Sequence, residues 1–344
     1  MKAKIRFALI MAFIVGTTIT IVLYNTHRPR LLILHSNGSE NEQIRPINRG
    51  LRDELRSKQH FSIRWYYSGL NAMVSKHLAE AESLRVRNLV SALKPDVILA
   101  VGDEAQEYVT RYYANDPVIK VVYCAVHGDV TSYGLDHAAN ATGSLMTPPL
   151  DALHDLLLEL GRQLAVAKPI RVFHVGDRTD DVQDDGSYME GKKWGNVHFV
   201  GNQYVGTFDE WKLAVGQAAK RADFILTSDY HALSRSSFDQ TPVPAREVVV
   251  WTETHSPIPV VGSRAHYVGD GGMLAVGASM YEQGRAAGSI AIKLLELHAS
   301  PADIPRVMSN EFVVAASESR LKEKNLYLPD IYKALARASN NYFQ

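Results

Sequence analysis

The sequence predicts an α/β protein of two doubly wound parallel-sheet lobes, joined by a hinge and preceded by one N-terminal transmembrane helix. Two segments, Asp96–Val101 and Val118–Val126, are almost continuously apolar, as strands are when helices cover both faces of a parallel sheet. Along most of the chain such strands alternate with helix-like segments, which indicates strand–helix–strand units. The chain has 344 residues, and at about 100 to 200 residues per domain this length predicts two lobes.

An apolar segment at the N-terminus predicts a membrane anchor. Lys2, Lys4 and Arg6 precede residues 7–24, which contain no charged side chain. As a helix this segment spans about 27 Å, close to the thickness of a hydrocarbon core, and the basic flank places its start in the cytoplasm. We expect an uncleaved signal anchor and linker over residues 1–30, single-pass localisation in the inner membrane, and a globular part in the periplasm. A cleaved secretory signal is the alternative.

The first lobe is expected over residues 31–143. Its predicted strands are residues 31–35, 61–67, 96–101 and 118–126, and its predicted helices include residues 44–57 and 72–93. Apolar residues recur on one face of both helices, as they do when a helix packs on a sheet. Right-handed crossovers between these elements are sufficient to fold a complete lobe.

The second lobe is expected over residues 144–310, where the same alternation restarts. The predicted strands are residues 170–175, 197–204, 223–227, 258–261 and 273–276, and the predicted helices are residues 150–166, 208–221, 246–254 and 281–297. Residues 176–187 are expected to form a loop. One more strand at 312–315 and helices at 318–324 and 328–338 are expected to take the chain, over residues 311–344, back toward the first lobe.

The ligand site of such a fold is expected beyond the carboxyl ends of the strands. In the first lobe these positions are Ser36, Asn37, Gly102, Asp103, Glu104, His127 and Asp129. Asp103 and Glu104 suit the first turn of a helix but repel an anionic ligand. With Glu40 and Glu42 they predict an acidic rim, and so a cationic, polyol-like or altered ligand. Alternatively, these carboxylates only stabilise helix starts in solvent.

The matching positions in the second lobe are Asp177, Arg178, Ser228, Asp229, Tyr230 and Asp270. We expect Arg178 to meet a ligand carboxylate and Tyr230 to stack on an apolar part of the ligand. The alternative is that each is a solvated loop residue or a packed helix cap.

Several short motifs follow one another in an order that resembles a known family. They are Pro95–Ile98 leading into Gly102–Ala105, Val122–Val126, Gly134–Leu135, Asn140–Gly143, Gly272–Ala275, Tyr281–Gly288, Pro301–Pro305 and Phe312–Ala315. Together they resemble the ABC-transporter substrate-binding proteins of the tryptophan and tyrosine type, which have the type I periplasmic-binding-protein-like fold. The resemblance implies that two lobes close on a small polar solute, amino-acid-like or altered, for an ABC importer or a sensing partner, without catalysis.

The chain departs from this family at the proposed site. Asp103 and Glu104 stand where the family has Thr and Pro, and His127–Asp129 replaces an Asp-Pro loop. These departures keep a second hypothesis open, in which the fold serves as a non-catalytic accessory or scaffold subunit of an inner-membrane complex that includes an ABC permease, a sensor or another subunit.

Other functions are disfavoured by composition and spacing. Lys plus Arg equals Asp plus Glu, at 37 each, so no overall field attracts nucleic acid. The 13 histidines show no paired metal-binding spacing, and the only cysteine, Cys124, lies in an apolar strand. Asp181–Gly186 resembles half of a calcium loop, but Lys192 occupies the position of the bidentate Glu. No nucleophile elbow, P-loop or dinucleotide motif is present, so we expect no metal, no cofactor and no enzyme.

Overall fold

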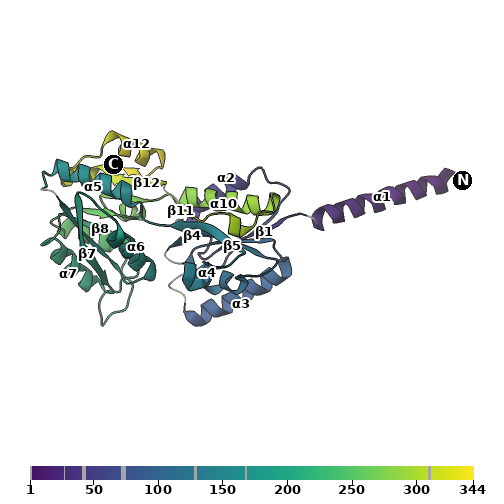
Figure 1. The fold of residues 1–344 in the computed structure, drawn as a ribbon, viewed down its shortest axis with the longest axis horizontal. Coiled ribbons are helices and arrows are strands. Elements are labelled where there is room, and N and C mark those ends of the chain that lie inside the picture. The colour runs from purple at the N-terminus through teal and green to yellow at the C-terminus, as the bar shows by residue number, and fades with distance from the viewer. Residues whose placement is uncertain are drawn as a thin grey trace. The chain divides into compact units, whose positions relative to one another are not determined.

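The chain forms two compact α/β units in a computed structural model, which describes residues 2–26, 28–40, 44–70, 75–127, 130–166, 169–308 and 311–344 (Figure 1). Within α1 (Lys2–Thr26) it describes the side chains of residues 6, 7 and 9–20. Lobe one comprises residues 1–124, 130–143 and 284–306, and lobe two comprises residues 125–129, 144–283 and 307–344. The predicted α/β class with two largely parallel sheets is therefore confirmed.

The first sheet, most of whose residues lie in lobe one, has the strand order β11-β5-β4-β3-β1-β2. Its strands are β1 (Arg30–His35), β2 (Ser62–Tyr67), β3 (Val97–Val101), β4 (Lys120–His127), β5 (Ala141–Met146) and β11 (Val307–Met308). β1 pairs in parallel with β2 and β3, and β3 pairs in parallel with β4. Every residue of β3 is buried, as its continuous apolar sequence predicts.

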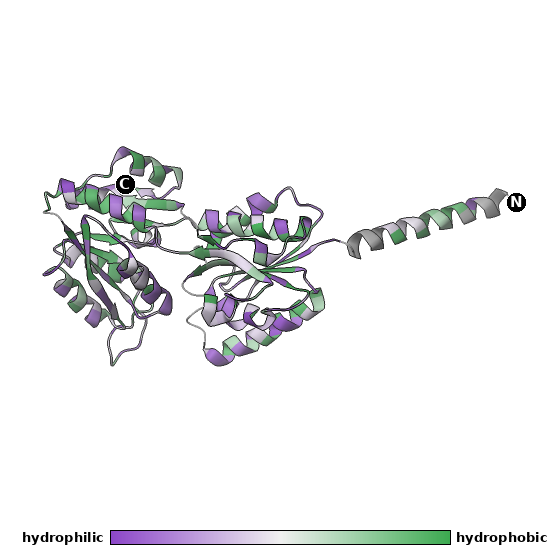
Figure 2. Ribbon diagram, in the orientation of Figure 1, coloured by the Kyte–Doolittle hydropathy of each residue, from purple (hydrophilic) through white to green (hydrophobic). Residues whose placement is uncertain are grey.

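Helices and short helical turns connect these strands. They are α2 (Arg45–Leu55), α3 (Lys76–Leu93), α4 (Asp103–Tyr108), α10 (Met280–Glu296) and the 3₁₀ turns Thr110–Tyr113, Val130–Tyr133 and Pro301–Asp303. In Figure 2 these helices carry both hydrophilic and hydrophobic residues, in keeping with one face packed and one in solvent.

Two glycines of α10 bring that helix into close contact with α2, beside which it is drawn in Figure 1. A Cβ at Gly284 would lie 2.2 Å from the backbone oxygen of Ile47, and one at Gly288 would lie 3.1 Å from Cβ of Glu54. These small residues therefore permit a close helix–helix contact.

The sheet of lobe two has the strand order β13-β12-β10-β9-β8-β6-β7. Its strands are β6 (Ile170–Asp177), β7 (Val197–Val205), β8 (Phe224–Thr227), β9 (Val260–Gly262), β10 (Leu274–Ala278), β12 (Phe312–Ser317) and β13 (Tyr342–Phe343). Its helices are α5 (Leu150–Gln163), α6 (Asp180–Gly191), α7 (Phe208–Ala218), α8 (Ala245–His255), α9 (His266–Gly269), α11 (Glu318–Glu323) and α12 (Asp330–Ala338).

Both faces of this second sheet are buried. Successive side chains of a strand point to opposite faces, and along β6 Val172 packs in one hydrophobic cluster with α5 while Phe173 packs in another with α7. Leu226 and Ile225 of β8 divide in the same way between the two clusters. Lobe two is therefore doubly wound, with helices on both faces of its sheet.

The structure differs from the sequence prediction in the second half of the chain. Residues 284–306, expected in lobe two, belong to lobe one, and residues 307–344, expected partly as a return crossing, belong to lobe two. There β12 pairs antiparallel with β10, and β13 pairs with β12. The expected loop at 176–187 is largely replaced by helix α6, which begins at Asp180.

The prediction of a membrane-spanning anchor is contradicted. A spanning helix needs about 20 consecutive, mostly apolar residues, and within the described residues no helix meets that requirement of length and apolarity. The prediction of a transmembrane helix over residues 7–24 is therefore wrong, and so is the single-pass inner-membrane localisation inferred from it.

Candidate functional site

Polar residues follow three neighbouring strands of lobe two at their carboxyl ends. β6 ends at Asp177, Ser228 follows β8, and Arg264 lies two residues beyond β9. β8 pairs in parallel with both β6 and β9, so these strands end at the same edge of the sheet. We call the side chains gathered there the lobe-two network: His174, Asp177, Asp181, Asp185, Ser228, Asp229, Tyr230, His231, Arg264, His266 and Asp270.

Arg264 joins three carboxylates of this network. Its Nη1 lies 2.8 Å from Asp181 Oδ2 and 3.1 Å from Asp229 Oδ2, and its Nη2 lies 2.9 Å from Asp185 Oδ2. Asp181 and Asp185 are four residues apart on α6 and so present their carboxylates from one helix face. Burial alone would lower the pKa of Arg264, but Asp185, Asp181 and Asp229 together raise it well above its usual value. The guanidinium is therefore a permanent charge.

Asp229 is held by backbone and side-chain donors. It accepts hydrogen bonds from the backbone N–H of Tyr230 at 2.7 Å and of His231 at 3.1 Å, and its Oδ1 is bonded to Nδ1 of His231. Burial would raise the pKa of Asp229, but His266, His231 and Arg264 hold it far below the usual range. The carboxylate is thus ionised at any physiological pH.

Asp270 and the two histidines complete this part of the network. The Tyr230 hydroxyl donates to Asp270 Oδ2 at 2.6 Å, and Nε2 of His231 lies 3.6 Å from the same oxygen. Nε2 of His266 lies 3.7 Å from Asp229 Oδ2. The side chain of Asp270 is 25% exposed and that of Asp229 17% exposed, so both carboxylates are still accessible from solvent.

His174 and Asp177 lie beneath these groups in the interior. The His174 ring bonds to Asn202 Oδ1 at 3.1 Å and to Ser228 Oγ at 3.0 Å, and its burial lowers its pKa to about 4. Asp177 accepts from the Thr179 hydroxyl at 2.6 Å and from the backbone N–H of Ala232 at 3.1 Å. Burial and the nearby Asp229 raise the pKa of Asp177. These side chains set the positions of the more exposed ones.

The structure brings together five of the six residues that the sequence selected in lobe two. Asp177, Ser228, Asp229, Tyr230 and Asp270 all belong to the network, although Asp177, Ser228 and Tyr230 are almost completely buried. Arg178 lies outside it: its side chain is 62% exposed and forms an ion pair with Glu210 at 3.1 Å. The expected meeting of Arg178 with a ligand carboxylate stays a prediction.

The residues that the sequence assigned to the first lobe follow β1, β3 and β4, although the structure places residues 125–129 in lobe two. Gly102 has φ +90°, and a Cβ there would lie 2.2 Å from Oγ of Ser36, so this junction requires glycine. Asp103, which opens α4 in front of Glu104, accepts a hydrogen bond from the Tyr133 hydroxyl at 3.1 Å. Asn37 follows Ser36, and His127 is the last residue of β4. Asp129, like Glu42, lies outside the described residues.

Six members of the network were not selected from the sequence: His174, Asp181, Asp185, His231, Arg264 and His266. Arg264 and His266 lie in a segment without a recognised motif, and their partners come from α6 and from the loop after β8. The available signal was the spacing of Asp181 and Asp185, which suggested part of a calcium loop. On a helix the same spacing instead places two carboxylates one turn apart.

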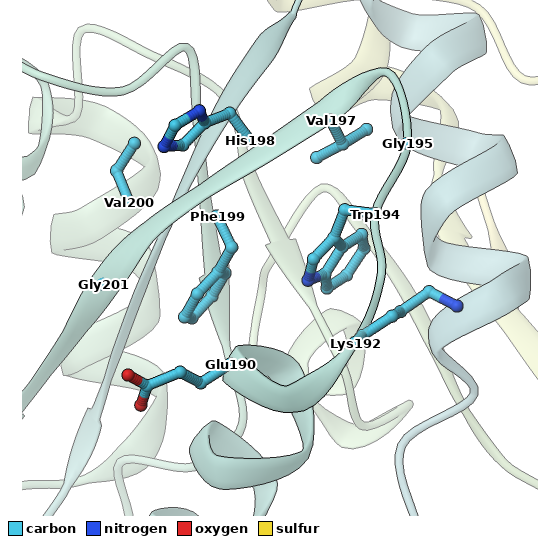
Figure 3. Close-up of a pocket in the computed structure, with 9 residues that line it drawn as sticks. All are labelled: Glu190, Lys192, Trp194, Gly195, Val197, His198, Phe199, Val200 and Gly201. Carbon is cyan, nitrogen blue, oxygen red and sulfur yellow. The ribbon is translucent and has the colours of Figure 1, made fainter.

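A separate cavity of about 500 Å³ lies along the edge strand β7 (Figure 3). Its lining residues are Glu190, Lys192, Trp194, Gly195, Val197, His198, Phe199, Val200 and Gly201. The rings of Trp194 and Phe199 stack with their centroids 6.2 Å apart, and Nε1 of Trp194 already donates to the backbone oxygen of Met189 at 2.6 Å. Since this cavity contains no member of the lobe-two network, the network remains the candidate site.

The two lobes and the polar residues at their strand ends define a class: the fold is that of type I periplasmic-binding proteins. Residues 205–339 match a family model described as ABC transporter substrate binding protein. The family resemblance inferred from the sequence is therefore confirmed, and this part of the chain is similar to the ABC-transporter substrate-binding proteins. A comparison with curated protein sequences gives no match.

Solved structures share the fold at low sequence identity. The open, ligand-free substrate-binding protein CD0873 of Clostridium difficile, which has adhesive properties, has a TM-score of 0.64 at 16% identity, covering 88% of this chain and 96% of that chain. An ABC domain from Streptococcus pneumonia in complex with L-Trp has a TM-score of 0.60 at 17% identity, covering 90% and 98%. A conserved domain protein from Vibrio cholerae has a TM-score of 0.60 at 16% identity, covering 92% and 100%.

Acidification is expected to destabilise lobe two through His174. The pKa of this histidine falls from 6.5 to about 4 because burial disfavours the charged ring, although Asp185 and Asn202 oppose the shift. A depressed histidine pKa contributes stability that is complete above about pH 6.5 and is lost as pH falls toward 4, which amounts to about 2 kcal/mol between pH 6.5 and 5. His231, whose pKa is raised, acts in the opposite direction.

The His174→Gln variant isolates this contribution. Denaturant unfolding of the variant between about pH 7 and 5 is expected to show a flatter dependence on pH than the wild type. The His198→Gln variant, altered at an exposed position, is expected to keep the wild-type slope. Equal slopes for wild type and His174→Gln would show that His174 is not the titrating group.

Proposed function

We propose that this protein binds a small, positively charged solute, such as an amine-bearing amino-acid-like molecule, and delivers it to an ABC importer. The observation that carries the proposal is the charge of the lobe-two network. It contains five carboxylates, Asp177, Asp181, Asp185, Asp229 and Asp270, and one guanidinium, that of Arg264. Grouped carboxylates repel one another, and a bound cation relieves that repulsion.

The accessible carboxylates are the proposed contacts. The side chains of Asp181 and Asp270 are 30% and 25% exposed, whereas Asp185, which like Asp181 is bonded to Arg264, is 5% exposed. An ammonium group can form charge-assisted hydrogen bonds with Asp181 and Asp270, which are stronger than neutral ones. The site therefore favours a cation over an anion of similar size.

The family relationship supports a binding function in preference to catalysis. Substrate-binding proteins of this fold present a ligand to a membrane transporter, and we infer that solute binding serves the same purpose here. One protein of similar fold is in complex with L-Trp, which is consistent with an amino-acid-like ligand. We propose no cofactor for this binding step.

A thermal-shift screen of the full chain tests the proposed function. In buffer with EDTA, at least one of arginine, lysine, putrescine and spermidine is expected to raise Tm by several degrees at saturating concentration. Succinate, glutamate and glucose serve as the anionic and neutral comparisons and are expected to have smaller effects. If no amine raises Tm, or if the acids do so equally, a cationic ligand is contradicted.

A second candidate function is that of a non-catalytic accessory or scaffold subunit of a protein complex. The observation that favours it is the internal use of Asp177, Ser228 and Tyr230, which bond to other residues of lobe two and are nearly buried. Co-purification of the tagged chain with a stoichiometric partner, together with no response in the solute screen, would support this function over solute binding.

A further inference from the structure

Three side chains of the lobe-two network offer metal-ligand atoms at one point. Asp229, His231 and His266 each present one such atom, and these atoms all lie within 4.8 Å of one another. We propose that lobe two binds a divalent first-row transition-metal ion such as Zn²⁺ through Asp229, His231 and His266. This site goes beyond the proposed solute binding and does not depend on the identity of the solute.

The position of His266 is the second observation behind the proposal. Its Nε2 is buried and has no hydrogen-bond partner among the residues that the structure describes, and the nearest carboxylate oxygen, Asp229 Oδ2, is 3.7 Å away. That distance is too long for a hydrogen bond. It is close to the separation of about 3.4 Å between two tetrahedral zinc ligands with bonds near 2.0 to 2.1 Å. A metal ion would satisfy this buried nitrogen.

The surrounding residues hold Asp229 and His231 in place. Asp229 is fixed by the backbone N–H groups of Tyr230 and His231. His231 uses Nδ1 to bond Asp229, which directs its Nε2 toward Asp270 Oδ2 at 3.6 Å. Asp270 is in turn held by the Tyr230 hydroxyl at 2.6 Å. Such hydrogen bonds to ligand side chains orient a metal site and fix the histidine tautomer.

The donor set selects the kind of ion. Two imidazoles and one carboxylate suit Zn²⁺ and its first-row neighbours, whereas Mg²⁺ and Ca²⁺ prefer oxygen donors throughout. Arg264 also contacts Asp229 Oδ2, at 3.1 Å, but Asp181 and Asp185 balance its charge. Histidine binds a metal ion through the neutral form of its ring.

Titration of the full chain with Zn²⁺ tests the site directly. The protein is purified without a histidine tag, stripped with EDTA and exchanged into chelator-free buffer. Calorimetry is expected to show one Zn²⁺ per chain, no comparable binding of Mg²⁺, and a rise of Tm on adding Zn²⁺. Co²⁺ is expected to give visible absorption bands, which report a bound ion independently of stability.

Matched variants separate this site from weak binding elsewhere. His266→Gln and His231→Ala are each expected to weaken Zn²⁺ binding by at least about tenfold, whereas His198→Ala, at an exposed position on β7, is expected to bind as the wild type does. Melting curves in EDTA check that each variant is folded. The proposal is overturned if the wild type does not bind Zn²⁺, or if both ligand variants bind it as tightly as the wild type.

This result is independent of the solute screen. The solute screen is run in EDTA, so an amine can raise Tm even if Zn²⁺ does not bind in the separate titration. That outcome would contradict only the proposed metal site. Zn²⁺ binding without any response to amines would contradict the proposed solute and support the metal site.

Discussion

Replacing Arg264 with alanine is expected to lower the free energy of unfolding of lobe two by about 3 to 5 kcal/mol. Arg264 is paired with Asp181, Asp185 and Asp229, and only 16% of its side chain is exposed. Its removal would leave three closely spaced carboxylates without a counter-ion in a poorly solvated region. Denaturant unfolding followed by tryptophan fluorescence measures the loss, since Trp194, Trp211 and Trp251 lie in lobe two.

Two control variants test whether the loss of stability comes from the ion-pair network of Arg264. Arg178→Ala removes an arginine of the same lobe whose side chain is 62% exposed and paired with Glu210, and it is expected to change stability by no more than about 0.5 kcal/mol. Arg264→Lys keeps the charge but cannot reproduce the planar fork, so an intermediate loss is expected. Similar stabilities for Arg264→Ala and Arg178→Ala would show that the ion-pair network does not stabilise lobe two.

Replacing Trp211 with alanine is expected to cost about 3 to 5 kcal/mol, as large-to-small substitutions in a packed core do. Trp211 is 1% exposed, and its Nε1 donates to the Thr252 hydroxyl at 2.8 Å. Its ring also packs edge-on against Tyr230, with centroids 6.1 Å apart. The cavity left by the alanine would therefore loosen the support of Tyr230 and, through it, the hydrogen bond to Asp270.

A substitution on the same helix and a conservative change at Trp211 serve as controls. Leu213, also on α7, is 64% exposed, and Leu213→Ala is expected to change stability by no more than about 0.5 kcal/mol. Trp211→Phe keeps most of the buried ring and loses the indole N–H, so it is expected to cost less than Trp211→Ala. If Leu213→Ala were as destabilising as Trp211→Ala, the assignment of the core face of α7 would be wrong.

Much of the fold was predictable because buried parallel strands have a strong sequence signature. β3 and β4 were located from continuous apolar residues, since a strand covered on both faces cannot alternate. The fold of the last part of the chain was harder to predict. β12 is antiparallel to β10, and β13 has two residues, and a strand's direction and neighbours depend on contacts between distant segments. Local sequence periodicity does not encode those contacts.

The position of the candidate site in the fold was predictable, but the full set of residues that form it was not. The rule that ligands bind at strand carboxyl ends selected Asp177, Asp229 and Asp270, which the structure brings into one network. It did not select Arg264, because an arginine in a loop acquires its role only from the carboxylates that tertiary folding places around it. His231 and His266 were missed for the same reason: they lie 35 positions apart in sequence, yet their ring centroids are 4.9 Å apart.

The most direct test of solute binding is calorimetric titration, in EDTA, of the wild type and two variants with the amine that raises Tm most. Asp270→Asn removes a charge from the network while keeping an acceptor for Tyr230, and Asp209→Asn alters an exposed carboxylate of α7. We expect one site per chain, binding at least about tenfold weaker in Asp270→Asn, and wild-type affinity in Asp209→Asn. Equal affinity in all three proteins would contradict the assignment of the lobe-two network as the solute site.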